Sequence, residues 1–348
     1  MSRKLITIST IMTLMSTSVI ADVPNVAADI APIHSLVSRV MDGVGAPKLI
    51  VQSGASPHGY RLRPSEAKAL QDADHVFWMG EELTPWLDSA IGTLASKASV
   101  TTLLDQQGVI LHDFREGALF EAHDHSAHGD DDHDDHDDHK DHDDHKDHDD
   151  HKDHDDHDDH DDHKDHDDHD DHDDHDDHGS HDPHAWLSPE NAKLWLNIIA
   201  SKLSVSDPEN AATYFMNAAA GQAEIEAMIT EVKATLKPVQ GGKFVVFHDA
   251  YQYFENDFDF YASGAISLGD SSDPSPARIE KVQKRIRDEG IQCVLAEPQF
   301  KKGLVATVME GSDATASVID PLGAELETGP KLYTRLIKNM AKTLRNCF

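Results

Sequence analysis

The stretch Gly179-Ser180-His181-Asp182-Pro183-His184-Ala185-Trp186-Leu187-Ser188-Pro189 marks the point where a polar repeat gives way to a folded domain. Before it, from Asp130 to His178, the chain consists of aspartate, histidine and four lysines, with a histidine at every third position from His133 on. After it, apolar residues recur at the spacing of a helix. The chain therefore re-enters the fold here and carries His184 with it as a candidate metal ligand.

The repeat itself cannot fold alone, because it has no apolar surface to bury against the entropy cost of ordering. It holds 29 aspartates and 4 lysines, so that with neutral histidines it contributes −25 of the net charge of −35. Imidazole and carboxylate groups bind divalent transition metals, which predicts many weak, exchangeable metal sites. The alternative is a solvated tail without function. The accessory metal ligands we assign are His133, His136, His139, His142, His145, His148, His151 and His154.

The first 21 residues have the features of a secretory signal that is cleaved before Asp22. Arg3 and Lys4 supply a positive start, an apolar segment follows, and small residues precede the predicted cleavage point. The alternative is an uncleaved anchor. No lipobox cysteine is present in this segment, so we expect a soluble exported protein located in the periplasm.

Alternating strand and helix patterns in the rest of the chain predict an α/β fold with mainly parallel sheets flanked by helices. We expect two lobes, at 22–206 and 239–348, joined by a long helix within 207–238, with the His/Asp-rich segment 116–180 as a disordered insertion. The expected strands are 26–32, 48–51, 75–79, 100–104, 243–247, 265–268, 293–296 and 317–319. The expected helices are 33–42, 66–73, 82–94, 189–203, 210–236, 275–289, 305–310 and 332–344.

Within these elements, Pro32 is expected to stop the first strand, and Ser65 is expected to cap the second helix. The only cysteines are Cys293 and Cys347. In an oxidising compartment such a pair suggests a disulfide, and two free thiols are the alternative.

Four candidate metal ligands follow apolar strands and stand beside a proline or a turn: His58, His184, His248 and Asp320. The carboxyl ends of parallel strands are where ligands bind in open α/β sheets. Three imidazoles and one carboxylate form the tetrahedral nitrogen and oxygen set that zinc prefers. Three other histidines are interpreted differently. His34 is expected either to support a metal ligand or to be a surface or helix-capping histidine. His75 and His112 are expected to be structural.

Five segments together resemble a known family. They are 57–65 (Pro-His-Gly-Tyr-Arg-Leu-Arg-Pro-Ser), 181–189 (His-Asp-Pro-His-Ala-Trp-Leu-Ser-Pro), 247–251 (Phe-His-Asp-Ala-Tyr), 296–300 (Ala-Glu-Pro-Gln-Phe) and 319–323 (Ile-Asp-Pro-Leu-Gly). In this order the chain resembles the cluster A-I solute-binding proteins of bacterial ABC transporters, and within them the zinc-specific, ZnuA-like periplasmic branch. The resemblance implies two α/β lobes joined by one long rigid helix, zinc at the lobe interface and delivery to a membrane permease. It also implies a disulfide between Cys293 and Cys347.

Two positions bear on the metal. Some zinc-binding members place a glutamate directly before the first histidine, where this chain has Pro57, so the fourth ligand is either Asp320 or water. Manganese-binding relatives typically have a carboxylate as third ligand, where this chain has His248. Because imidazole is the softer donor, His248 favours zinc over manganese.

We therefore expect a monomeric, non-enzymatic protein that captures Zn2+ with high affinity for an ABC permease. The His-rich repeat would be an accessory low-affinity zinc collector or sensor, and an accessory periplasmic zinc chaperone is a further candidate partner. Protonation of the imidazoles should weaken zinc binding between about pH 7.5 and about pH 5.5. The alternatives are a manganese or iron transporter component, an adhesin on the same scaffold, or a zinc hydrolase. The hydrolase is disfavoured because the chain has no His-Glu-x-x-His motif. The acidic chain argues against nucleic acid as a partner.

Overall fold

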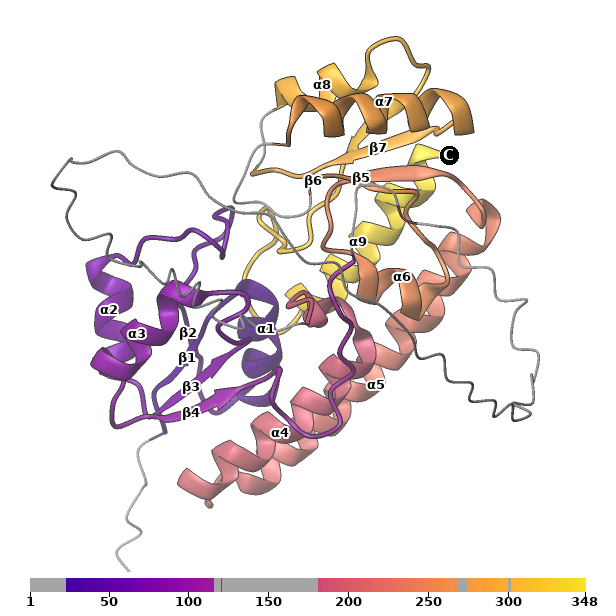
Figure 1. Cartoon of the computed structure of the whole chain (residues 1–348). Coiled ribbons are helices and arrows are strands. Elements are labelled where there is room, and N and C mark those ends of the chain that lie inside the picture. Colours follow the sequence, from indigo (N-terminus) through magenta and orange to yellow (C-terminus); the bar gives the residue numbers. More distant parts are fainter. Residues whose placement is uncertain (1–22, 116–119, 121–180, 268–273, 300–301) are drawn as a thin grey trace, which may run out of the picture. The chain divides into compact units, whose positions relative to one another are not determined.

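A computed structural model of the 348-residue chain describes residues 23–115, 120, 181–267, 274–299 and 302–348 (Figure 1). The described residues all belong to one unit of the chain. The predicted signal peptide and nearly all of the predicted insertion lie outside them.

The first half of the fold is built on a four-stranded parallel sheet with the order β2-β1-β3-β4. Its strands are β1 (Val26–Ala28), β2 (Lys48–Leu49), β3 (His75–Trp78) and β4 (Ser99–Thr102). The helices between these strands are α1 (Ala31–Val40), α2 (Pro64–Gln71) and α3 (Pro85–Leu94). Every residue of β1 and β3 is buried, as expected for the central strands of a parallel sheet that is covered on both faces.

The second half repeats this plan with a parallel sheet of order β6-β5-β7-β8. Its strands are β5 (Phe244–His248), β6 (Ala265–Ser267), β7 (Cys293–Ala296) and β8 (Thr315–Val318). Its helices are α6 (Gln252–Phe258), α7 (Pro276–Glu289), α8 (Lys302–Met309) and α9 (Leu332–Cys347). The predicted fold class, two parallel sheets flanked by helices, is confirmed.

Two long helices connect the sheets. After the one-turn helix η1 (Ala185–Leu187), α4 (Pro189–Ser206) runs antiparallel to and packs along α5 (Ala211–Leu236), which also contacts α1 and α9 and is followed by η2 (Lys237–Val239) (Figure 1). The Ser188 hydroxyl caps α4 by accepting from the Asn191 N–H, and Pro189 occupies the first turn as predicted. The 26 residues of α5 span roughly 39 Å. The predicted long helix is therefore present, and the lobe boundaries assigned around it remain a prediction.

Several predicted element boundaries differ from the observed ones by a few residues, and two residues, both at or beside a proline, were given the wrong role. Pro32 lies in the first turn of α1 rather than at the end of a strand. The cap of α2 is Arg63, followed by Pro64, so Ser65 is already inside the helix. The first turn of a helix has N–H groups without partners, so proline loses nothing there. The short helix α6 was not predicted.

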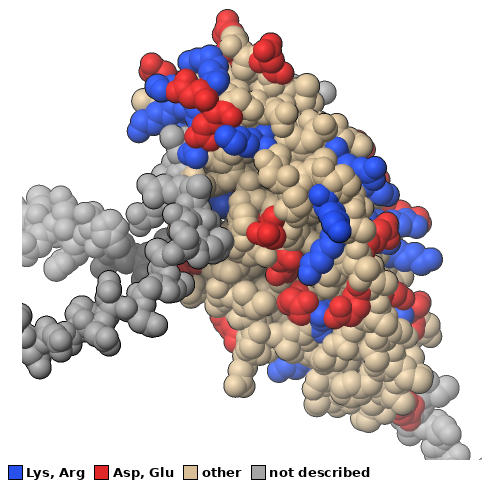
Figure 2. Space-filling model, turned by 90° about the vertical axis from the view of Figure 1, so that its right-hand side faces the viewer, with Lys and Arg blue, Asp and Glu red and all other residues tan. Residues whose placement is uncertain are grey.

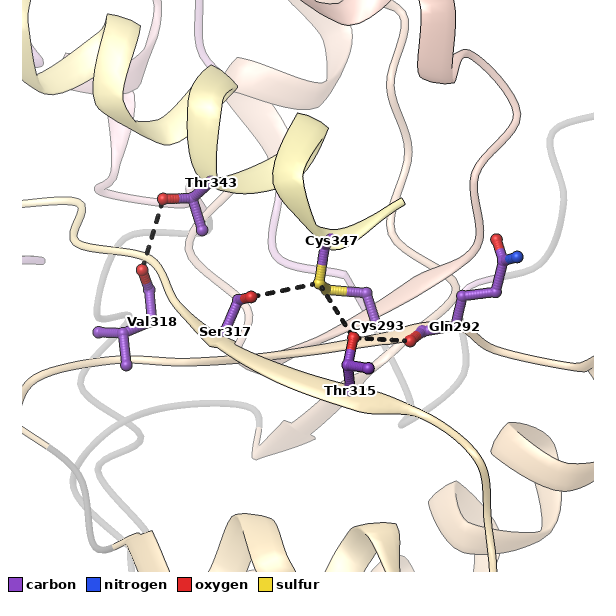
Figure 3. Close-up of a disulfide and its surroundings, with 7 residues drawn as sticks. All are labelled: Gln292, Cys293, Thr315, Ser317, Val318, Thr343 and Cys347. Atoms are coloured by element: carbon purple, nitrogen blue, oxygen red, sulfur yellow. Dashed lines mark hydrogen bonds between the residues drawn. A yellow bond between two sulfur atoms is a disulfide. The ribbon is translucent and has the colours of Figure 1, made fainter.

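A disulfide between Cys293 and Cys347 joins the start of β7 to the end of α9, with the two Cα atoms 5.7 Å apart (Figure 3). It closes a sequence separation of 54 residues. The hydroxyl of Thr343 on α9 also donates to the Val318 carbonyl on β8, over 3.5 Å. The last helix is thereby fastened to two strands of the second sheet, as the predicted disulfide requires.

Figure 2 shows lysine and arginine side chains interspersed with aspartate and glutamate on a face made mostly of other residues. This agrees with the expectation that most of the acidity belongs to the repeat rather than to the folded part. Among the helices that the structure describes, none has the length and apolar content needed to cross a membrane.

Candidate metal centre

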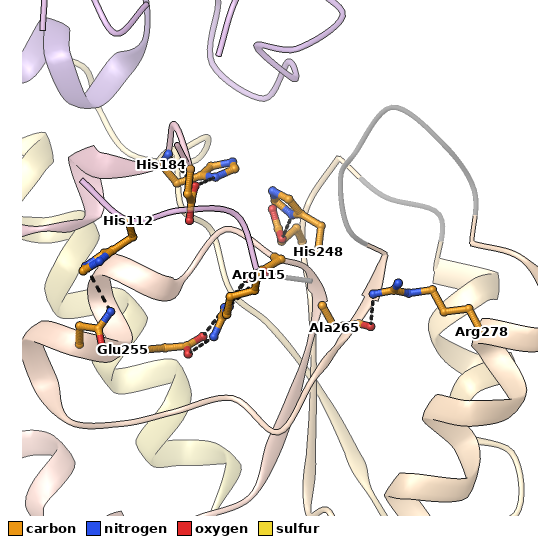
Figure 4. A network of polar contacts seen from close by, with 11 residues as sticks. His112, Arg115, His184, His248, Glu255, Ala265 and Arg278 are labelled. Carbon is orange, nitrogen blue, oxygen red and sulfur yellow. Dashed lines mark hydrogen bonds and ion pairs between the residues drawn. The ribbon is translucent and has the colours of Figure 1, made fainter. Parts of the chain in front are cut away.

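Three predicted ligands, His58, His184 and His248, meet in one place. Each offers one ring nitrogen, and these three nitrogens all lie within 4.8 Å of one another. The ring centres of His58 and His184 are 5.5 Å apart, and those of His184 and His248 are 5.3 Å apart. Figure 4 shows His184 and His248 close together above the polar network discussed below. They are the one group of this kind among the residues described, and the spacing suits three nitrogens around a single ion.

His58 sits in the loop between β2 and α2, and aromatic side chains hold this loop. The indole N–H of Trp86 donates to the carbonyl of Pro57 over 2.7 Å. Tyr60 packs against Trp86, with ring centres 5.6 Å apart, and donates its hydroxyl to buried Glu66 over 2.7 Å. The loop that carries His58 is thus tied to α2 and α3, which fixes the backbone of this half-buried histidine.

His184 stands at the start of η1 and is buried. The Asp182 carboxylate accepts from both the backbone N–H of His184, over 2.9 Å, and its Nδ1, over 2.6 Å. Trp186 lies beside the ring at 5.2 Å and donates its indole N–H to the carbonyl of Pro321 over 2.8 Å. The His-Asp-Pro-His-Ala-Trp segment therefore orients its own ligand and packs it against the second half of the chain.

His248 is the last residue of β5 and is also buried. Its Nδ1 donates to the Glu297 carboxylate over 2.5 Å. Glu297 comes directly after β7, the neighbouring strand, and its other oxygen accepts from the Gln299 amide over 2.7 Å. Two adjacent strand ends thus supply a histidine and the carboxylate that orients it.

These carboxylates determine which nitrogen of each ring would bind a metal. An ionised carboxylate only accepts hydrogen bonds, so Nδ1 of His184 and of His248 carries the proton. Nε2 of each ring then presents its lone pair to the metal. Two of the three histidines around a bound metal would therefore each be supported by a carboxylate. The roles of Asp182 and Glu297 were not predicted, although both lie inside the motifs that were singled out.

Asp320, the fourth predicted ligand, is not a member of the histidine group. Its two oxygens accept from the backbone N–H groups of the next turn, at Leu322, Gly323 and Ala324, over 3.0, 2.8 and 2.5 Å. Burial raises the pKa of this carboxyl, and those N–H groups oppose the shift. Asp320 as a ligand therefore remains a prediction, with water as the alternative.

The other folded histidines are placed apart from the centre. His34 is buried in α1 beside the carbonyl of Pro47, 3.2 Å away, and burial lowers its pKa. His75 opens β3 next to the Ser206 hydroxyl, and burial lowers its pKa too. His112 packs on the Tyr253 ring at 4.6 Å. These contacts are structural, as expected for His75 and His112. The eight accessory histidines of the repeat lie outside the described residues.

Comparison with known proteins identifies the family to which this fold and centre belong. The family profile for the zinc-uptake complex component A, periplasmic (ZnuA), matches residues 26–347. The chain belongs to the ZnuA family. A ZnuA protein of Brucella abortus, named a high-affinity zinc uptake system protein, is 48% identical over 322 residues, covering 92% of this chain and 91% of its own. The ZnuA of Paracoccus denitrificans is 43% identical, covering 94% and 92%. ZnuA is a periplasmic zinc-uptake component, so the chain is a transport protein rather than an enzyme.

Solved structures agree on the fold. A crystal structure of ZnuA matches with a TM-score of 0.67 at 21% identity, covering 94% of this chain and 99% of that one. FpvC of Pseudomonas aeruginosa, solved in complex with Mn2+, matches with a TM-score of 0.68 at 17% identity over 93% and 98%. A laminin-binding adhesin of Streptococcus agalactiae matches with a TM-score of 0.67 at 18% identity over 93% and 99%. One scaffold therefore occurs in ZnuA, in a protein solved with manganese and in an adhesin.

Proposed function

We propose that the chain captures Zn2+ with high affinity through His58, His184 and His248 and presents it to the membrane permease of an ABC transporter for import. The observation that carries this proposal is the convergence of three imidazole nitrogens within 4.8 Å of one another. Two of these imidazoles are oriented by buried carboxylates. Zinc is the cargo, and the protein's task is to bind and release it.

The donor set supports zinc over other ions. Three imidazoles leave a fourth tetrahedral position for Asp320 or water, whereas manganese prefers more oxygen ligands. The pairing of Asp182 with His184 and of Glu297 with His248 increases the basicity of the metal-binding nitrogens. Relatives named for high-affinity zinc uptake, at 48% and 43% identity, support the same cargo.

The periplasm is the location that the family description supports, and a cleaved signal over residues 1–21 is the proposed route there. In this proposal the mature protein is a monomer, and the repeat collects zinc with low affinity or senses it. A periplasmic zinc chaperone is a further proposed partner. The lobes are proposed at 22–206 and 239–348, on either side of the linking helix.

Calorimetric zinc titration tests the proposal on the mature chain and on a variant without Asp130–His178. We expect one tight site in both proteins and several weak sites only where the repeat is present. His58→Gln should weaken the tight site strongly, whereas His75→Gln, which changes a histidine of β3 outside the centre, should leave it unchanged.

Loss of the tight site together with the repeat would refute the assignment of His58, His184 and His248. Manganese displacing zinc from the tight site in a competition titration would instead favour the manganese or iron alternative. The metal and the ligand residues are thus tested by separate measurements.

A further inference from the structure

Arg115 forms a buried ionic network beside the metal centre (Figure 4). Its guanidinium donates to both oxygens of the Asp249 carboxylate, with two Nε contacts of 3.0 Å and a shorter contact from Nη2. It also donates to both oxygens of Glu255 in α6, over 2.6 and 3.2 Å. The Phe120 ring covers the guanidinium, with its centre 3.6 Å from Cζ. Five hydrogen bonds to two carboxylates and the contact with one ring hold this planar group in a single orientation.

The network connects the backbone segments that carry two of the three histidines. Asp249 directly follows His248. On the other side, the segment before Arg115 pairs with the segment before His184: the Asp182 N–H donates to the carbonyl of His112 over 2.7 Å. The Tyr253 hydroxyl adds a link, because it accepts from the His112 N–H and donates to the carbonyl of Asp182.

Burial makes this network costly to leave incomplete. The side chains of Arg115, Asp249 and Glu255 are 13%, 6% and 1% exposed. Burial raises the pKa of both carboxyl groups, and Arg115 opposes that rise. Burial would lower the pKa of Arg115, but the two carboxylates outweigh it and raise that pKa. The charges therefore depend on one another, and the guanidinium fixes where both carboxylates lie.

We propose that Arg115 is a positioning residue of the metal centre, which holds the His248–Asp249 turn against the segment that carries His184. This inference rests on the function proposed above and adds a residue that acts through its bonds to the Asp249 and Glu255 carboxylates. A displacement of that turn would move His248 relative to His184, and tight zinc binding needs both nitrogens in place.

The competing explanation is that Arg115 only neutralises the two buried carboxylates and does not position the turn. Two variants separate these explanations. Arg115→Met removes the guanidinium but leaves two buried carboxylates without their partner. Arg115→Met combined with Asp249→Asn and Glu255→Gln removes all three charges, so folding no longer depends on a missing cation. Zinc affinity of the tightest site is measured by chelator competition, and the Co2+ absorption spectrum reports the coordination geometry.

We expect both variants to bind zinc at least about tenfold more weakly than the unmodified chain and to show an altered Co2+ spectrum. Arg39→Met is the matched control. The Arg39 side chain is 14% exposed and bonds both oxygens of Glu224, but it joins α1 to α5. Its loss should change zinc affinity by less than about twofold.

Recovery of normal zinc affinity and of the Co2+ spectrum in the triple variant would overturn the inference, because charge balance alone would then explain Arg115. If the single variant does not fold, the triple variant still decides the question. Failure of the proposed function has a different signature, in which His58→Gln leaves the tight site of the otherwise unmodified chain intact.

Discussion

Asp182 and Glu297 each accept a hydrogen bond from Nδ1 of a histidine in the centre, over 2.6 and 2.5 Å. We predict that Asp182→Asn and Glu297→Gln each weaken zinc binding about tenfold to 100-fold, because an amide supports the imidazole less strongly than a carboxylate. Chelator competition measures the affinity. Asp257→Asn serves as the control, since Asp257 is partly buried and accepts from Ser188 rather than from a candidate ligand. Affinities within about twofold of the unmodified chain would show that these carboxylates do not support the metal.

Asp29 makes folding depend on pH. It is fully buried at the end of β1, where its oxygens accept from the N–H groups of Ile30 and Met79, both over 2.7 Å. Burial raises its pKa from 3.8 to about 7, against these hydrogen bonds. The folded state therefore binds a proton more tightly than the unfolded chain does. This stabilisation is complete below the unfolded pKa of about 4 and is lost as the pH rises through about 7.

Urea unfolding of the metal-free protein at pH 5 and pH 8 tests this prediction. The Asp29 contribution should make the protein about 3 kcal/mol more stable at the lower pH. Asp29→Asn cannot titrate, so the difference between the two pH values should shrink by about that amount in this variant. An unchanged difference would mean that the pKa of Asp29 is not raised.

The sequence predicted His58, His184 and His248 because strand ends of a parallel sheet gather at one edge, a property of the topology. It did not predict the side-chain orientation of Asp320 or of the carboxylates beside the histidines. Asp320 follows a strand in the same way, yet the N–H groups of Leu322, Gly323 and Ala324 hold both of its oxygens. The partners of His184 and His248 were missed for the same reason, since a pairing across strands depends on side-chain orientation.

Among the elements, the short helix α6 could not be predicted from the sequence pattern. It has seven residues, too few to form an isolated helix, and packing rather than propensity stabilises it. Tyr253, Phe254 and Phe258 are all buried. It ends at Asp259, a non-glycine residue with φ of 51°. The long helices, by contrast, were predicted within a few residues because their caps and apolar spacing agree.

Replacing two helical glycines by alanine should change the stability of the protein in opposite directions. Gly92 in α3 has nothing within 4 Å of an added Cβ, so Gly92→Ala should stabilise the protein by about 0.5–1 kcal/mol through helix propensity. In α5, a Cβ on Gly221 would lie 2.9 Å from buried Leu196 and 3.1 Å from Arg39. Gly221→Ala should lose the propensity gain and destabilise by about 1–3 kcal/mol, because α4 and α5 pack too closely there. Urea unfolding of both variants measures the contrast, and equal stabilisation would contradict the close packing.

At the scale of the whole molecule, the candidate centre draws on both sheets. His58 follows β2 of the first sheet, His248 ends β5 of the second, and His184 precedes the helices that connect them. A ligand that binds only the folded chain stabilises it by an amount set by the ratio of its concentration to its Kd. An ion held by both halves should therefore stabilise the folded unit as a whole.

We predict that zinc at about 1,000 times its Kd raises the free energy of unfolding by about 4 kcal/mol, and that a chelator reverses the rise. The measurement uses a variant without Asp130–His178, so that weak sites in the repeat do not contribute. The same variant with His58, His184 and His248 all replaced by glutamine should gain nothing from zinc. If it gained as much, the stabilising site would lie elsewhere in the chain.

If zinc stabilised only one half in amide exchange, the ion would not join the two sheets. Protection of residues around both His58 and His248 is the result that a shared ion requires.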